Sequence, residues 1–248
     1  MNGGQSKPPS LACPDESGNI FDVVTKLAEP APSGISFGPL SLALELIGAI
    51  AARHLGLAVP GYAIVEVNRE FANSVPGNMK RLFNNNLGLH FGSAYLQQFI
   101  EFQAGTPVSV ETDLQLLKDI MAFDAMVLNS DRRKHNPNLL ESGDDYILID
   151  HSTILTVHVP PHVDDYMTDQ QLRDHVLFKN LTGNHRRYET HISQWNSKMT
   201  TAEIDQLFSF VPMEWTVQSA SYRLIVDFMR TRYTQGAVVK SRLKQVIK

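Results

Sequence analysis

The residues best suited to chemistry lie in one short stretch, residues 129–152, with the sequence NSDRRKHNPNLLESGDDYILIDHS. Asp131 follows an apolar segment, the amide Asn136 comes five residues later, and Asp150 ends a short apolar run. Pro137 disfavours a helical conformation at Asn136, so we expect the chain to loop back there. Such a loop would bring carboxylate and amide oxygens to one cleft, and oxygen ligands suit Mg²⁺, which also binds substrate phosphates.

Two other interpretations of this stretch stay open on spacing alone. Asp and Asn side chains also cap helix ends and turns, so a polar loop without any chemistry would show the same pattern. His135 and His151 would suit a softer metal, although nothing in the sequence places a third ligand beside them.

Two charged residues in the first half of the chain have apolar neighbours. Glu45 lies in the segment LSLALELIGAIAARHLG and Lys26 in DVVTKLA. Burial of a lone charge is costly, so each is expected to need a partner of opposite sign. A strand lysine paired with a helix glutamate is the arrangement by which kinases hold a lysine over the nucleotide phosphates. The alternative is that both side chains simply reach solvent.

The composition excludes several classes of protein. Of the 248 residues, 43% are hydrophobic and 19% charged, which indicates a folded globular chain with one large domain or two lobes. The net charge of −4 gives no support for a nucleic-acid partner. A single cysteine, Cys13, excludes an internal disulfide. The chain shows no signal peptide, and its most apolar stretch is too short to span a membrane. We therefore expect a soluble, cytoplasmic protein.

The pattern along the chain predicts strands first and helices later, an α+β fold with segregated halves. In the first half, the sequence favours strands at 19–28, 59–67 and 89–99, a buried helix at 40–55, and no defined element in the Asn-rich segment 68–88. In the second half, helices are predicted at 112–128, after capping boxes at Thr168/Gln171 and Thr200/Glu203, and from about 217. The boundary between the halves is expected near 97–110.

Taken in order, these motifs resemble the HipA-like kinases, in particular a short bacterial branch. NSDRRKHNPNLL is similar to the catalytic loop of that branch, LIDHS to its metal-binding strand end, and LALELIGAIAARHLGLAVP to its glutamate-bearing helix. GGQSKPPSL, DVVTKLA, HFGSAYL and VPMEW match in the same order. The catalytic block also resembles that of type II phosphatidylinositol kinases. The resemblance implies a two-lobed protein-kinase-like fold: a small N-lobe of antiparallel strands and one helix (1–97), a hinge or linker (98–110) and a mostly helical C-lobe (111–248).

The resemblance also implies a role for individual residues. It makes Asp131 the catalytic base, assigns Mg²⁺ to Asn136 and Asp150, and gives Arg132 a charge near the phosphates. The residues implied to bind ATP are Lys26, Glu45 (which would orient Lys26), Gly3, Gly4, Gln5 and Ser6. Asp124, on the apolar face of its helix, is expected to be a structural acid that bonds the catalytic loop.

The implied activity is ATP- and Mg²⁺-dependent phosphotransfer to a hydroxyl, with protein serine or threonine as the first expectation and a lipid or small molecule as the second. Two alternatives remain: transfer of AMP from ATP bound in the reverse direction, and a nucleotide-binding regulatory module without turnover. The sequence identifies neither the acceptor nor an antitoxin-like partner.

Overall fold

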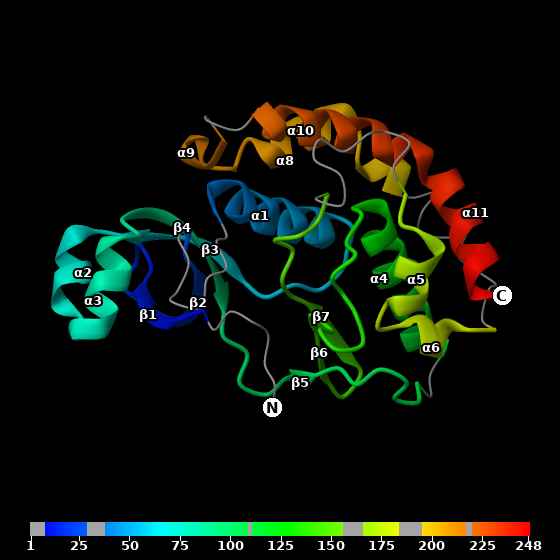
Figure 1. Cartoon of the computed structure of the whole chain (residues 1–248), viewed down its shortest axis with the longest axis horizontal. Helices are drawn as coiled ribbons and strands as arrows, with labels where there is room; N and C mark the ends of the chain where they lie inside the picture. Colours follow the sequence, from blue (N-terminus) through cyan, green and yellow to red (C-terminus); the bar gives the residue numbers. More distant parts are fainter. Residues whose placement is uncertain (1–7, 29–37, 109–110, 156–165, 184–194, 217–219) are drawn as a thin grey trace.

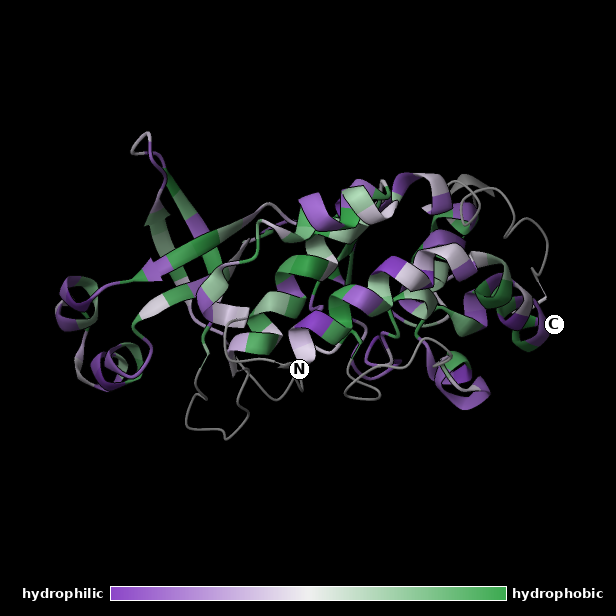
Figure 2. Cartoon of the chain, turned by 90° about the horizontal axis from the view of Figure 1, so that it is seen from above, coloured by the Kyte–Doolittle hydropathy of each residue, from purple (hydrophilic) through white to green (hydrophobic). Residues whose placement is uncertain are grey.

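The chain forms an α+β structure with a four-stranded sheet and two short helices at one end, and most of the helices together with a second, three-stranded sheet toward the other (Figure 1). The structure is a computed structural model, and it describes residues 8–28, 38–108, 111–155, 166–183, 195–216 and 220–248. Figure 2 shows the same separation from above, with the four-stranded sheet at one end and most helices at the other. The fold class expected from the sequence is therefore confirmed.

The first sheet has four antiparallel strands in the order β1-β2-β4-β3. These strands are β1 (Ser10–Pro14), β2 (Ile20–Lys26), β3 (Tyr62–Val67) and β4 (Gly88–Ala94). Each strand expected in the first half of the chain is present. Lys26 is the last residue of β2 and pairs with Phe91 of β4, so the sheet fixes the backbone that carries the lysine.

The long helix of the first half is α1 (Gly38–His54), and most of its residues are buried. As predicted, Gly56 lies just past its end, and the φ of 90° at this glycine lies in the left-handed region that glycine tolerates. The amide of Leu57 donates to the carbonyl of Ala52 at 2.9 Å and closes the helix end. In addition to β4, α1 contacts α8 (Thr201–Phe208) and α9 (Met213–Thr216), which come from the last fifth of the chain.

The Asn-rich segment contains two helices that the sequence analysis did not predict, α2 (Arg69–Ser74) and α3 (Gly77–Asn84). Asn68 begins α2 by accepting a bond from the amide of Phe71 at 2.8 Å. Phe83 from α3 then packs with Leu27 and Val67 in a small separate core. The polar composition concealed an N-cap and a short apolar face.

A second sheet, in the order β5-β6-β7, lies beside the helices. Its strands are β5 (Ile100–Glu101), β6 (Leu139–Ser142) and β7 (Asp145–Leu148). Residues 98–110, which we expected to be a linker, thus contribute a strand paired with β6. β7 ends two residues before Asp150.

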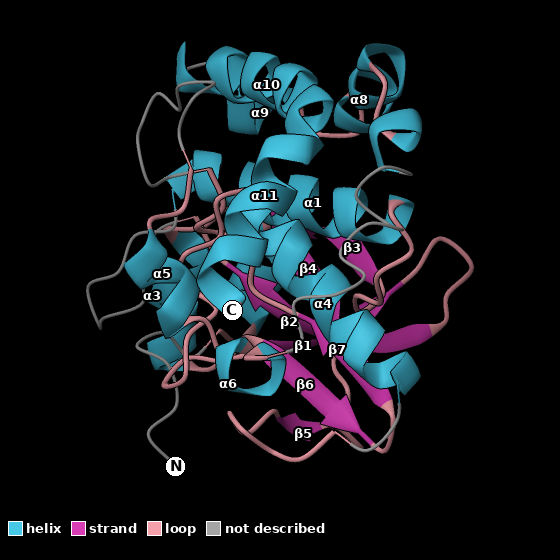
Figure 3. Ribbon diagram, turned by 90° about the vertical axis from the view of Figure 1, so that its right-hand side faces the viewer, coloured by secondary structure: helices cyan, strands magenta, loops and turns pink. Residues whose placement is uncertain are grey.

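The helical part begins with α4 (Glu111–Met126). Both predicted capping boxes are present, at the starts of α5 (Asp169–Asp174) and α8. The remaining elements are α6 (Phe178–Leu181), α10 (Ala220–Arg232), the 3-10 helix η1 (Tyr233–Gln235) and α11 (Gly236–Ile247). α10 lies over α1, on the side away from the second sheet (Figures 1 and 3). Among the helices that the structure describes, none combines the length and the hydropathy needed to cross a membrane.

The principal hydrophobic core runs through both halves. One cluster of buried residues includes Leu42 and Ile47 of α1 together with Leu117 and Ile120 of α4. The fully buried Arg232 fixes the end of α4 by donating to the carbonyls of Met126 (3.1 Å) and Ala125 (3.0 Å). The last turn of α4 leads to Asp131, so the core and this cap determine where that acid lies.

Candidate active site

Lys26, Glu45 and Asp150 form an ionic cluster at the end of β2, in which the lysine and the glutamate are buried and Asp150 is half-buried. The Lys26 ammonium contacts Glu45 Oε1, and its distance to Asp150 Oδ1 is 2.7 Å. Exposure of the side chain is 11% for Lys26 and 1% for Glu45. The pairing of Lys26 with Glu45 that the sequence predicted is confirmed, and neither side chain simply reaches solvent. Asp150 is an additional partner of the lysine that we had not anticipated.

The charges in this cluster depend on one another. Burial opposes the charge of Lys26, but the carboxylates of Glu45 and Asp150 outweigh it and raise the pKa of the ammonium. Burial likewise opposes the charge of Asp150, yet the adjacent ammonium lowers the pKa of that carboxyl group. Burial raises the pKa of Glu45 to about 7, because the lysine compensates it only in part. Asp150 is therefore ionised, the form that a cation requires.

Glu45 also connects α1 to the chain that follows β7. Its Oε2 accepts a hydrogen bond from the amide of His151 at 2.8 Å, while its Oε1 contacts the lysine. Asp150 itself has a φ of 56° and accepts a bond from Ser152 Oγ at 2.8 Å. One carboxylate of α1 thus fixes both the lysine and the backbone beside the second acid.

Asp131 lies in a loop that folds back as Pro137 predicted. The backbones of Arg133 and Asn136 exchange two hydrogen bonds, of 2.9 and 3.1 Å. Asp131 Oδ2 accepts one bond from Asn136 Nδ2 (2.8 Å) and another from Asn138 Nδ2 (3.2 Å). The bond from Asn136 uses the amide nitrogen, so the amide oxygen is the atom with which this residue would bind a cation.

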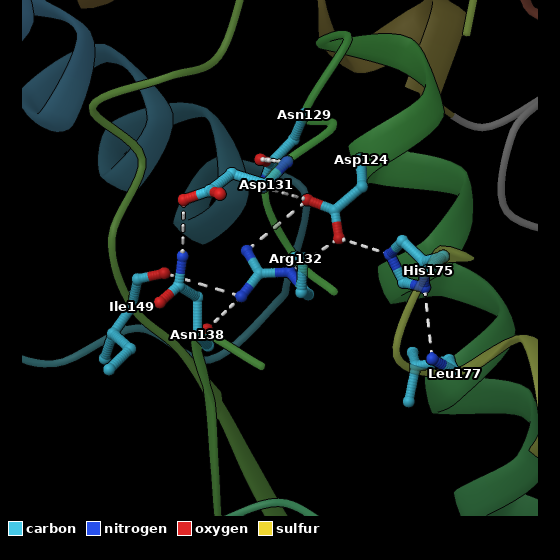
Figure 4. Close-up of polar contacts among 8 residues, drawn as sticks. All are labelled: Asp124, Asn129, Asp131, Arg132, Asn138, Ile149, His175 and Leu177. Atoms are coloured by element: carbon cyan, nitrogen blue, oxygen red, sulfur yellow. Dashed lines mark hydrogen bonds and ion pairs between the residues drawn. The ribbon is translucent and has the colours of Figure 1, made fainter. Parts of the chain in front are cut away.

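Arg132 has a position different from the one we expected. Its side chain is fully buried, and its Nε donates to Asp124 Oδ2 at 2.6 Å (Figure 4). Its Nη1 donates to the carbonyl of Asn138 and, at 3.4 Å, to that of Ile149. These contacts give Arg132 a structural role inside the protein, and its expected charge near the phosphates stays a prediction.

Asp124 is the centre of this buried network, as expected of a structural acid. It accepts bonds from Asn129 Nδ2 at 2.7 Å and from His175 Nε2 at 3.0 Å (Figure 4). His175 Nδ1 accepts a bond from the amide of Leu177 at 3.2 Å, so the ring proton is on Nε2. Burial opposes the charge of Asp124, but Arg132 and His175 lower its pKa to about 2.

Asn138 connects the two acidic centres. Its carbonyl accepts bonds from Arg132 and from the amide of Ile149, the residue before Asp150. Its side chain holds Asp131, as described above. The loop of Asp131 and the strand end are therefore joined through Asn138. Asn136 bonds Asp131 within the loop, whereas Asp150 bonds Lys26 beside the strand end.

The sequence analysis missed two residues of the site, His175 and Asn138. The repeated amide in NPN was the only sequence signal for Asn138. Gly3, Gly4, Gln5 and Ser6 lie outside the described residues. In the described part of the chain, no three His, Cys, Asp or Glu side chains gather as a metal-binding group.

Comparison with known proteins adds one finding. A family model described as HipA-like kinase matches residues 11–238 of the chain. The match includes Lys26, Glu45, the loop of Asp131 and the strand end with Asp150. The chain has no match among curated proteins.

Proposed function

The chain belongs to the HipA-like kinase family, and from this premise we propose that it transfers the γ-phosphate of Mg·ATP to a serine or threonine hydroxyl of a protein. Membership of this family makes a kinase-type phosphotransferase the general activity. The observation that supports phosphotransfer to a hydroxyl is the junction of two centres: a buried lysine held by two carboxylates, and a loop acid held by two amides. The choice of protein serine or threonine as the acceptor follows from the family resemblance.

In the proposed reaction, the ionic cluster of Lys26, Glu45 and Asp150 would bind the phosphates of the nucleotide. Lys26 has three N–H donors, so it can keep its bond to Glu45 and donate another to a phosphate oxygen. Phosphoryl transfer depends mainly on positioning and on charge stabilisation, and a lysine fixed in this way contributes to both. Since Asp150 is bound to the same ammonium, the lysine must share or exchange this partner when phosphates arrive.

The residues present fit a magnesium ion. Asp150 offers an ionised carboxylate and Asn136 an amide oxygen, both hard ligands of the kind that Mg²⁺ prefers. When bound, Mg²⁺ would neutralise negative charge on the phosphates. A site with so few protein ligands would hold its cation largely through the phosphates, so metal and nucleotide are expected to bind together.

Asp131 would act on the hydroxyl that accepts the phosphate. Asn136 and Asn138 both donate to Oδ2, which fixes the carboxylate plane and makes Oδ1 the oxygen for the acceptor hydroxyl. Acceptance of the hydroxyl proton by a positioned carboxylate is the role of the loop aspartate in kinases. The bond to Asn136 would also tie the base to the cation, because one amide serves both.

The test is a labelling experiment with two forms of ATP. The protein is incubated with Mg²⁺, a heat-treated cell lysate and ATP labelled at either the γ- or the α-phosphate, with Asp131→Asn as the control for residual lysate kinases. Label from γ-ATP alone, recovered as phosphoserine or phosphothreonine after acid hydrolysis, is the expected result. Label from α-ATP would show AMP transfer instead. Nucleotide binding by calorimetry without any transfer would favour the regulatory module.

A further inference from the structure

Gly48 lies in the middle of α1, where the helix meets the chain that carries Asp150 and His151. A Cβ atom at Gly48 would lie 2.4 Å from His151 Cβ, 2.6 Å from Cγ and 2.9 Å from Cδ2. All three distances are shorter than real contacts allow, so an alanine here would require the helix or the histidine to move. Glycine weakens a helix interior relative to alanine, and this contact is the structural reason for a glycine at this position.

His151 fills the space between α1 and α4. Its side chain is buried, and its ring packs edge-on against Phe123 of α4, with centroids 6.2 Å apart and planes at 79°. Its amide donates to Glu45 Oε2, three residues before Gly48 on the same helix. The histidine therefore cannot move away from α1 without lengthening this bond, and it cannot move toward α4 without displacing a core aromatic ring.

We propose that Gly48 is a positioning residue of the candidate active site. Because it has no side chain, α1 lies close enough to His151 for Glu45 to hold the strand end and Lys26 together. Asp150, the neighbour of His151, then reaches the lysine. The consequence for nucleotide binding rests on the proposed function, but the contact itself can be tested without nucleotide.

The first test is amide hydrogen exchange of the unliganded protein. Gly48→Ala is expected to raise the exchange rate of the His151 amide by about 5- to 150-fold, the range that corresponds to overpacking of a well-packed core. The matched control is Gly77→Ala in α3, where an added Cβ would have no atom within 4 Å, and exchange at His151 should not change. A rise confined to residues near 151 supports a positioning role, whereas a uniform rise throughout the protein would overturn it in favour of general destabilisation.

The second test is a rescue that depends on one atom. His151→Gly removes all three atoms that an alanine at position 48 would meet, whereas His151→Ala keeps the nearest one, Cβ. Gly48→Ala should therefore accelerate exchange at residue 151 in the His151→Ala background and have no effect in the His151→Gly background. Equal effects in both backgrounds would overturn the proposal. If Gly48→Ala alone fails to fold, recovery of a folded double variant with His151→Gly supports the proposal, and failure of both overturns it.

The last readout connects the contact to the site. In calorimetric titration, Gly48→Ala should bind Mg·ATP about 5- to 150-fold more weakly than the wild type. The double variant Gly48→Ala/His151→Gly should bind Mg·ATP as tightly as the single variant His151→Gly. If exchange responds as expected but Mg·ATP affinity stays unchanged, Gly48 does not position the site. If the wild-type protein binds no Mg·ATP, the proposed function fails, while the exchange experiment still decides whether Gly48 sets the contact with His151.

Discussion

The buried network around Asp124 leads to a large and selective effect of one conservative change, Asp124→Asn. The carboxylate accepts bonds from Arg132, Asn129 and His175, all inside the protein. An amide has one acceptor oxygen and a donor NH₂, so it would face at least one of these donors with another donor. It would also leave the fully buried guanidinium of Arg132 without a counter-charge.

The magnitude follows from burial. Removal of one partner from a buried ion pair costs about 3–5 kcal/mol, because the remaining charge stays in a low-dielectric environment. The control is Asp205→Asn, which removes an acid that bonds Arg230 at 2.8 Å on the surface, where the two side chains are 46% and 37% exposed. An exposed pair contributes much less to stability than a buried one, so the loss should be clearly larger for Asp124→Asn than for Asp205→Asn.

The assay is equilibrium unfolding in urea, followed by circular dichroism, for wild type and both variants. The midpoint of Asp124→Asn should fall well below that of Asp205→Asn at an unchanged dependence on urea. Similar midpoints would refute the conclusion that Asp124 stabilises the loop around Asp131 through Asn129 and Arg132. If Asp124→Asn does not fold, His175→Ala removes one donor to the same carboxylate and the acceptor of the Leu177 amide, and it should still lower the urea midpoint below that of Asp205→Asn.

Three further predictions concern the same centres. The pKa of Asp124 falls from 3.8 to about 2 on folding, so this carboxylate contributes about 2 kcal/mol to the free energy of unfolding above pH 4. That contribution is lost as the pH falls from 4 to 2, and the loss should be absent in Asp124→Asn. Equal acid sensitivity of the wild type and the variant would contradict this prediction. Asp150→Ala should weaken calorimetric binding of Mg·ATP or abolish turnover, and wild-type activity with wild-type metal dependence would remove Asp150 from the metal site. Lys26→Met should leave the buried Glu45 without its counter-charge, lower the urea midpoint and weaken ATP binding. Unchanged ATP affinity would exclude a contact between Lys26 and the phosphates.

Charge in apolar surroundings was the most reliable signal in the sequence. Lys26 and Glu45 are found in contact because a buried charge needs a partner and each was surrounded by apolar neighbours. Strands, the buried helix and both capping boxes follow from local patterns and are present. The helices α2 and α3 were missed because their apolar faces are short and lie among asparagines.

What the sequence does not show is which distant residues meet. Arg132 is eight residues from Asp124 and His175 a further 43, so nothing local revealed that the arginine would be buried between them. Gly48 appeared to be one small residue among several in a helix, and its contact with His151 depends on the approach of two segments a hundred residues apart. Tertiary packing decides such positions, and a local pattern does not contain it.

The most direct test of the account is the separation of chemistry from nucleotide binding at Asp131. Three proteins are compared: the wild type, Asp131→Asn, and Asp144→Asn, which changes an exposed acid outside the site. For each protein, the transfer of γ-labelled phosphate and the calorimetric affinity for Mg·ATP are measured. A general base contributes about 10²–10⁴-fold, so transfer should fall by about that factor in Asp131→Asn alone, while the affinity for Mg·ATP changes little because Lys26 and Asp150 remain. Unchanged transfer, or loss of nucleotide binding by a folded Asp131→Asn protein, would contradict the assignment of Asp131 as the base.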